Sequence, residues 1–184
     1  MYVKKQLLTL NFILLCSLFC TAQIEVAHVS VKDFKSTGFA GFLNFSFPVS
    51  DANYVTLEGG LQYFKNKYDE DLALIPVLLG YRYTINQSGA GLYVEPNAGY
   101  CFGESTIGKY DEFGSLLAGN DGDWAKEKVA GPMAGIGVGY LFEPGGKVQF
   151  NIGLRYERTF GDAGVNVFAF RISHAFTFGK REEY

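Results

Sequence analysis

The sequence predicts an all-β fold, an eight-stranded antiparallel up-and-down barrel, and three observations support this prediction. Apolar and polar residues alternate through most of the chain, and successive side chains of a strand point to opposite faces. With 17 Phe, 12 Tyr and 23 Gly but only 5 Pro, the composition suits strands joined by tight turns. The alternating segments are separated by polar or glycine-containing connections, as expected for consecutive strands that run up and down.

Residues 1–22 are expected to be a cleaved secretory signal peptide that precedes the fold. Lys4 and Lys5 give a basic start, an almost uninterrupted apolar run follows over 7–20, and Ala22 is a small residue at the cleavage point. The run is too short for a comfortable membrane-spanning helix. A lipoprotein anchor on one of its two cysteines is the alternative, and the bulky residue before each cysteine disfavours it.

Residues 23–184 are then expected to form one barrel domain. Without residues 1–22 the chain keeps 14 Lys and Arg against 19 Asp and Glu, a formal charge of 14 − 19 = −5. Cys101 is the only remaining cysteine, so no internal disulfide can form. No later segment has the roughly 18 apolar residues of a membrane-spanning helix, so any membrane insertion requires strands. The chain also lacks the basic excess of a nucleic-acid-binding protein, and no nucleic-acid partner is expected.

The first three strands are predicted at 23–33, 38–47 and 54–64. The first strand alternates only weakly. The second places Phe45 and Phe47 on one face and small polar residues on the other. The third separates its aliphatic residues from its polar residues along the whole segment, which predicts a strand with two distinct faces.

The next three strands are predicted at 72–85, 91–102 and 128–142. Pro76 has no N–H to donate to a strand ladder, so a β-bulge or a local irregularity is expected there. Alternating glycines line one face of the sixth strand, and their missing side chains would leave room for long residues to cross the interior. These glycines are Gly135, Gly137 and Gly139.

The last two strands are predicted at 147–160 and 165–178. The final strand alternates most strictly, with four phenylalanines on one face and Arg171 on the other. Its end has two readings. Either Phe178 is the last strand residue and six residues follow it, or the strand continues to the terminal aromatic residue, Tyr184.

Short and longer connections are distributed unevenly along the predicted order of strands. The second, fourth and sixth connections, 48–53, 86–90 and 143–146, are all short. The others include a charged loop at 65–71 and the longest connection, at 103–127. Short turns at one end and longer loops at the other are typical of outer-membrane barrels.

The aromatic residues of the apolar face lie near the predicted strand ends, and aliphatic residues lie between them. Two aromatic girdles around an aliphatic band are favoured at the two surfaces of a lipid bilayer. A soluble β-sandwich has no reason to sort its aromatic residues by height. The apolar face is therefore predicted to meet lipid, which makes this a transmembrane barrel.

The opposite face carries three acids and three bases that balance in charge. They are Glu58, Arg82, Glu95, Arg155, Glu157 and Arg171. Inside a closed barrel such charges must pair, because an unpaired buried charge is costly. The interior of an eight-stranded barrel is just wide enough for side chains to fill. The sequence therefore predicts a polar, side-chain-filled lumen and no open pore.

Three stretches together carry a family resemblance: Ile75-Pro76-Val77-Leu78-Leu79-Gly80-Tyr81-Arg82-Tyr83, Gly135-Ile136-Gly137-Val138-Gly139-Tyr140, and the aromatic-rich last strand. With the signal peptide, they resemble the small outer-membrane β-barrel proteins of Gram-negative bacteria, of the OmpX and OmpA barrel type. This resemblance implies an outer-membrane location, contact with outer-membrane lipid, periplasmic N- and C-termini and a monomer. It also implies that the barrel assembly machinery reads the C-terminal strand.

Small barrels of this type include hydrolases that use His and Ser, but the catalytic pattern is missing from this sequence. Nucleophilic catalysis needs a base within reach and a third group that orients it. The two histidines, His28 and His174, do not lie beside an obvious acid. The acidic run 120–123 lacks the regular ligand spacing of a calcium-binding hand. We therefore predict no enzymatic activity, no cofactor and no metal.

The connection 103–127 remains as the only candidate binding surface outside the cell. Its aromatic and acidic residues could contact an extracellular partner or cap the rim of the barrel, and the sequence does not separate these roles. These residues are Tyr110, Asp111, Asp121, Asp123 and Trp124.

Three functions are consistent with these features. The first is an integral outer-membrane barrel with a structural or surface-interaction role. The second is a narrow barrel that passes or binds small hydrophobic solutes, which requires an apolar lumen. The third is a soluble, lipocalin-like barrel that binds a ligand in its interior.

Overall fold

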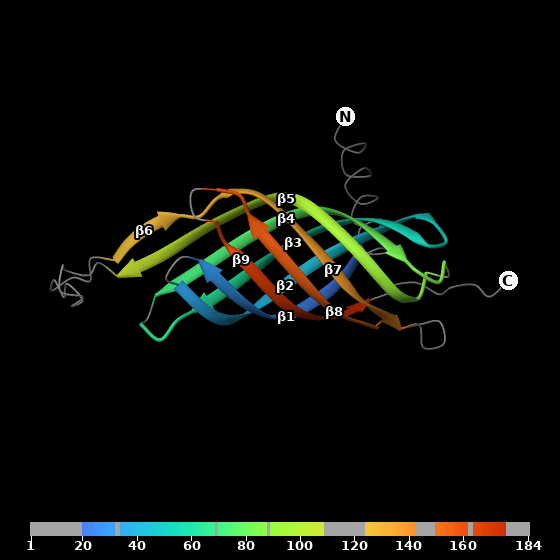
Figure 1. Ribbon diagram of the computed structural model, residues 1–184, viewed down its shortest axis with the longest axis horizontal. Coiled ribbons are helices and arrows are strands. Elements are labelled where there is room, and N and C mark those ends of the chain that lie inside the picture. The colour runs from blue at the N-terminus through green and yellow to red at the C-terminus, as the bar shows by residue number, and fades with distance from the viewer. Residues whose placement is uncertain are drawn as a thin grey trace, which may run out of the picture.

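The computed structural model describes residues 20–31, 34–68, 70–87, 89–108, 124–142, 150–161 and 164–175. Nine strands make up the regular structure of these residues, and they form a single sheet (Figure 1). In chain order they are β1 (Cys20–Val31), β2 (Phe34–Ser50), β3 (Asn53–Lys65), β4 (Asp71–Thr84), β5 (Gly91–Gly108), β6 (Trp124–Lys128), β7 (Gly131–Phe142), β8 (Phe150–Thr159) and β9 (Asn166–Ala175).

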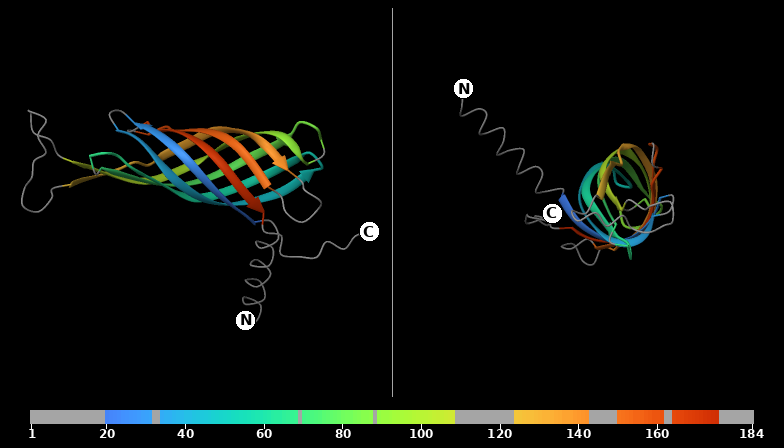
Figure 2. Two further views of the ribbon diagram at one scale, coloured as in Figure 1. Left: turned by 90° about the horizontal axis from the view of Figure 1, so that it is seen from below. Right: turned by 90° about the vertical axis from the view of Figure 1, so that its left-hand side faces the viewer.

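Eight of these strands close into a barrel. Every neighbouring pair is antiparallel, in the order β1-β2-β3-β4-β5-β7-β8-β9, and β9 returns to β1. The closing pair runs from Thr21 opposite Ala175 to Ser30 opposite Asn166. Seen along its axis, the molecule is a ring of strands (Figure 2). The predicted eight-stranded antiparallel up-and-down barrel is confirmed.

The two ends of the barrel differ. One end has the short turn Asp51–Ala52 and the connection 85–90, and β1 begins and β9 ends there. We call it the short-turn end. The opposite end, which we call the loop end, has the connection 66–70 and the extension of β5 beyond the barrel wall.

Strand β6 lies outside the barrel ring and continues the line of β7. It pairs with the last part of β5, from Glu104 opposite Lys128 to Gly108 opposite Trp124. The resulting β5–β6 ribbon extends past the other strands (Figures 1 and 2). The prediction of a loop over all of 103–127 is therefore wrong at both of its ends. A ribbon clear of the barrel wall has no core toward which apolar residues must alternate, so its sequence carries no strand pattern.

The weak pattern of the first strand has a structural explanation. Ile24 and Val26 of β1 point outward, whereas Ala27 and Val29 point inward and are buried. Apolar residues on both faces remove the alternation. The strand begins at Cys20, ahead of the predicted cleavage point, and pairs there with Phe45. The rest of the predicted signal peptide lies outside the described residues, and so do Phe178 and Tyr184, the two alternative ends predicted for the last strand.

Pro76 interrupts the ladder without changing its register. The β3–β4 pairs stop at Gly59 opposite Val77 and resume at Gln62 opposite Leu74, with the same offset on both sides. On its other side Pro76 lies opposite Cys101, in a stretch of the β4–β5 ladder that is continuous from Asp71 to Gly80. The predicted irregularity is present, and it is a local loss of pairing, with no inserted residue.

The distribution of apolar and charged side chains over the two surfaces of the barrel is the reverse of that in a soluble protein. Large apolar residues point outward, and Ile75 and Leu79 of β4 are 50% and 59% exposed. Arg82 of the same strand points inward and is buried. Among the described outward positions of the strands, charged residues occur only close to the loop end, so the band between the two ends carries no charge.

The same substitution at two adjacent glycines of β3 should have a large effect at one and almost none at the other. A Cβ atom at Gly60 would point inward, lie 2.6 Å from Cγ of Phe42 and also meet the backbone oxygen of Gly41. At Gly59 it would point outward and meet nothing within 4 Å. Gly60→Ala should lower the free energy of unfolding by about 1–3 kcal/mol. Gly59→Ala should change it by less than about 0.5 kcal/mol.

Urea unfolding in detergent micelles measures both variants. Equal midpoints for Gly59→Ala and Gly60→Ala would contradict the assignment of these two residues to opposite faces.

Candidate functional site

Seven charged side chains meet inside the barrel. They project inward from six strands because each lies at an inward position of the alternation, and each is at most 6% exposed. All six charged residues that the sequence predicts for the interior are among them. The seven are Glu25, Glu58, Glu95, Glu157, Arg82, Arg155 and Arg171.

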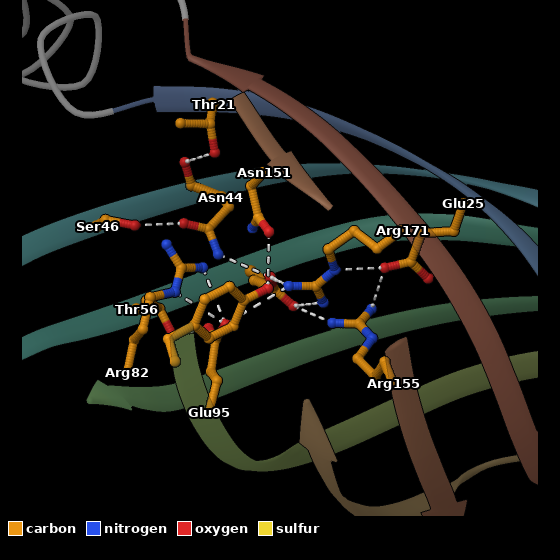
Figure 3. Close-up of polar contacts among 12 residues, drawn as sticks. Thr21, Glu25, Asn44, Ser46, Thr56, Arg82, Glu95, Asn151, Arg155 and Arg171 are labelled. Carbon is orange, nitrogen blue, oxygen red and sulfur yellow. Dashed lines mark hydrogen bonds and ion pairs between the residues drawn. The ribbon is translucent and has the colours of Figure 1, made fainter. Parts of the chain in front are cut away.

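Arg155 and Arg171 form the centre of this network, because both contact the same two acids. Arg155 pairs through Nη1 with Oε2 of Glu58 and lies 3.3 Å from Oε1 of Glu25. Arg171 donates from Nε to Oε1 of Glu25 at 2.9 Å, and its Nη1 lies 3.2 Å from Oε1 of Glu58. Two guanidinium groups and two carboxylates thereby join β1, β3, β8 and β9 (Figure 3).

Arg82 and Glu95 form a second pair nearer the short-turn end. Arg82 donates from Nε and Nη2 to Oε2 of Glu95, at 3.1 and 2.9 Å. Thr56 donates to the other oxygen, Oε1, at 2.8 Å. The guanidinium of Arg82 also lies 5.0 Å from the ring centre of Tyr93, within the range of a cation–π contact. Nη1 of Arg171 lies 3.5 Å from Oε2 of Glu95 and connects this pair to the central group (Figure 3).

Neutral side chains satisfy further oxygens of the acids. Asn44 donates to Glu58 at 2.7 Å, and Gln62 donates to Glu157 at 3.2 Å. Glu157 is also 3.0 Å from Nε of Arg155. Charge-assisted hydrogen bonds of this kind offset part of the cost of removing charges from water.

Tyr93 crosses the interior and donates to Asn151 at 2.9 Å. Its ring and hydroxyl occupy the space beside two glycines: a Cβ at Gly139 would lie 2.6 Å from the Tyr93 hydroxyl, and one at Gly153 would lie 2.8 Å from it. A Cβ at Gly135 would meet Glu157 and Asn97. The predicted role of glycines 135 and 139, to give long side chains room, is confirmed. A Cβ at Gly137 would have no contact closer than 3.7 Å.

Glu25 is the member of the network that the sequence did not reveal. It shares the inward face of β1 with Ala27 and Val29, so the polar residues of this strand do not mark one face. With Glu25 included, four acids face three bases, a formal excess of one acid. The one available signal was its spacing of two residues from Gln23, which is also buried.

The interior near the loop end is apolar, which differs from the prediction of a polar lumen throughout. Twelve buried residues pack into one cluster there, and Phe64 and Leu74 are 0% exposed. Strand β4 explains the difference, because it carries leucines on its inward face as well as aliphatic residues on its outward face. The cluster comprises Ala27, Val29, Phe64, Leu72, Leu74, Leu78, Cys101, Val129, Met133, Val165, Val167 and Ala169.

The predicted surface residues lie mostly beyond the described part of the chain. Tyr110, Asp111, Asp121 and Asp123 are outside the described residues. Trp124 is the first residue of β6, and its backbone lies opposite Gly108. The predicted surface role of these residues therefore stays a prediction.

The two histidines lie on the outer surface near opposite ends of the barrel. His28 of β1 is exposed, and its Nδ1 lies 3.2 Å from the hydroxyl of Thr37. His174 is exposed one residue before the end of β9, opposite Phe150. His174 therefore lies on the outer face at the short-turn end. Within the described residues, no three His, Cys, Asp or Glu side chains are grouped closely enough for a metal site.

Comparison with solved structures identifies the class of fold. Neisserial surface protein A (NspA) matches with a TM-score of 0.56 and 12% identity, over 86% of this chain and 96% of NspA. Ail of Yersinia pestis, solved in complex with the heparin analogue sucrose octasulfate, matches with a TM-score of 0.56 and 15% identity, over 85% and 95% of the two chains. The chain therefore has the fold of the small outer-membrane barrels of Gram-negative bacteria.

At these identities the likeness shows the fold alone. No protein-family model matches the chain, and no curated protein matches it by sequence. The described residues contain no helix that is long and apolar enough to cross a membrane.

Two arginines of β8 test the interior network. Arg155→Ala would remove the cation that contacts Glu25, Glu58 and Glu157, and should lower the free energy of unfolding by about 3–5 kcal/mol. Arg158→Ala on the same strand removes an exposed side chain and should cost less than about 0.5 kcal/mol. Equal losses, measured by urea unfolding in the same micelles, would show that the interior charges do not depend on one another.

Proposed function

We propose that the protein is an integral barrel of the outer membrane, with a closed interior and a structural or surface-interaction role. One observation carries this proposal: the described barrel wall is apolar and uncharged on its outside between the two ends, whereas seven charged side chains lie inside. In water this arrangement would expose an apolar surface far larger than soluble monomers tolerate. In a bilayer it matches the lipid-facing and lumen-facing sides of a transmembrane barrel.

The positions of the exposed aromatic residues along the barrel axis support membrane insertion. Near the short-turn end lie Phe47, Tyr81, Tyr83, Tyr140 and Phe142. Near the loop end lie Phe39, Tyr63, Tyr100, Phe102, Tyr156, Phe160 and Phe168. The exposed residues between these two sets are mostly aliphatic, such as Leu57, Val77 and Leu79. Such girdles are favoured where the bilayer meets water.

Two kinds of packing support a closed interior. The ion network extends from the short-turn half through the middle to Glu157, which lies opposite Val167 of the apolar cluster, and this cluster occupies much of the loop-end half. An ion entering from either side would have to displace paired charges or enter an apolar region. Both steps are costly, so we propose that the barrel does not conduct.

The apolar cluster is also the observation that favours the second candidate, a barrel that binds small hydrophobic solutes. Phe64, Leu74 and Leu78 belong to this cluster and are at most 1% exposed, so side chains already occupy the region. We therefore place the closed barrel first. A soluble, lipocalin-like barrel is disfavoured by the exposed apolar wall. The histidines lie on the outside, away from the buried acids, and we propose no catalytic role.

We propose that the short-turn end, where β1 begins and β9 ends, faces the periplasm, and that the β5–β6 ribbon stands outside the cell. The residues between its strands, 109–123, contain one lysine and four acids, a formal charge of −3. A partner that binds this segment would be cationic. Ail, by contrast, was solved with a polyanionic ligand. We also propose a monomer with no cofactor, assembled by the barrel assembly machinery.

Reconstitution tests the closed barrel. The full chain without residues 1–22, folded into phosphatidylcholine vesicles, should float with them in a density gradient and should produce no stable channel in planar-bilayer recordings. An open porin serves as the positive control. Stable, large conductance steps from the wild type would contradict the closed interior, and failure to float would contradict membrane insertion.

A further inference from the structure

The interior network has one acid more than it has bases. Its four carboxylates and three guanidinium groups leave a formal charge of −1, and none of these side chains is more than 6% exposed. An uncompensated charge in such a place is costly. We propose that the barrel encloses one monovalent alkali-metal cation beside Glu157, which makes the interior neutral. The proposal rests on the closed interior described above and adds a structural ion to it, whereas the sequence alone predicts no metal.

The pattern of ion pairs places the excess charge at Glu157. Each of the other three acids of the network contacts two arginines. Among the described residues Glu157 contacts one, Arg155, whose Nε lies 3.0 Å from Oε1 of Glu157. Arg155 also contacts Glu25 and Glu58. Glu157 therefore shares its single arginine with two further carboxylates and is the acid with the least compensation.

Two amide oxygens near Glu157 are buried without a hydrogen bond. Gln62 donates from Nε2 to Oε2 of Glu157 at 3.2 Å, but its own Oε1 accepts no hydrogen bond from the described residues. Oδ1 of Asn97 likewise accepts none from this part of the chain. Gln62 is 0% and Asn97 8% exposed, so bulk water does not reach these oxygens. Buried oxygens without a donor are uncommon in folded proteins, and a bound ion is one way to satisfy them.

These side chains meet beside the glycines of β7. A Cβ built on Gly135 would lie 2.8 Å from Cγ of Glu157 and 2.9 Å from Oδ1 of Asn97, so both side chains converge at this glycine. The next inward residue, Gly137, leaves space, because a Cβ there would have no contact closer than 3.7 Å. The interior next to Glu157 and Asn97 can therefore hold a group at least as large as a methyl, and a bare sodium ion is smaller than that.

The ligand atoms and the charge count select a monovalent, hard cation. Carboxylate and amide oxygens suit hard cations, and carbonyl oxygens replace the hydration shell of alkali ions in membrane proteins. One positive charge neutralises the network, whereas a divalent ion would leave an excess of one positive charge. Paired charges and the apolar cluster block the two ends of the barrel, so the ion would be enclosed as the strands close. Binding of the ion is then coupled to folding.

The dependence of folding on NaCl tests the site. Refolding and urea unfolding in zwitterionic detergent micelles are compared from about 1 mM to about 1 M NaCl. N-methyl-D-glucamine chloride keeps the ionic strength constant, because its cation is too large for the interior. If folding encloses one sodium ion, the folded-to-unfolded ratio at a fixed urea concentration should rise about tenfold for each tenfold increase in NaCl above the Kd.

Three variants locate the effect. Glu157→Gln keeps the shape of the side chain, leaves three acids against three bases, and should make the ratio independent of NaCl. Asn97→Leu removes one ligand oxygen and keeps the charge, so it should need about tenfold more NaCl than the wild type to reach the same ratio. The control Glu104→Gln removes an exposed acid from the loop end of β5 and should keep the wild-type dependence.

A wild-type ratio that does not change with NaCl would overturn the proposal, and so would equal dependence in the wild type and Glu157→Gln. A wild-type ratio that ignores NaCl but rises about tenfold for each unit fall in pH, with no such rise in Glu157→Gln, would show that Glu157 binds a proton in place of the cation. Vesicle flotation and bilayer recording of each variant separate these results from a failure of membrane insertion or of the closed interior.

Discussion

The barrel depends on the pairing of charged side chains in its interior, which side chains fill. Closing eight strands into a ring forces every second side chain inward, and the interior is only as wide as those side chains. Glu25 and Glu58 each contact both Arg155 and Arg171, so no member of this group faces the interior alone. Glu25 lies on the first strand of the barrel and Arg171 on the last. Their contact therefore also stabilises the seam where the two ends of the chain meet.

The pairing inside leaves the outside free to be apolar. Among the described strand residues, no outward position between the two ends carries charge, and the seven charged side chains of the network lie in the interior. The interior itself has two parts, an ion network and an apolar cluster near the loop end. This division distinguishes the barrel from one with a uniformly polar lumen, and it is the reason for placing a closed barrel ahead of a conducting one. The β5–β6 ribbon is then the feature through which the loop end would meet other molecules.

Much of the fold could be predicted from alternation, and the failures have physical causes. The last strand, with phenylalanines on one face and Arg171 on the other, shows its two faces directly. β1 does not, since Ile24 and Val29 are both apolar but lie on opposite faces. The six predicted interior charges are all buried, yet their partners depend on strand register, which alternation does not specify. The apolar interior near the loop end was not predicted, because Leu72, Leu74 and Leu78 share the face of Arg82 on a strand that is apolar on both faces.

Depth-dependent fluorescence quenching tests the central claim, that the outer wall faces lipid and the inner wall does not. Trp124 is the only tryptophan, so a Trp124→Phe background allows single tryptophans to be placed at will. Phe170→Trp on β9 points outward near the middle of its strand, and Phe64→Trp on β3 points inward. In vesicles of lipid brominated along the acyl chain, we predict strong quenching at position 170 and little at position 64. Equal quenching at both positions, or quenching of position 170 by aqueous iodide alone, would contradict a lipid-facing outer wall.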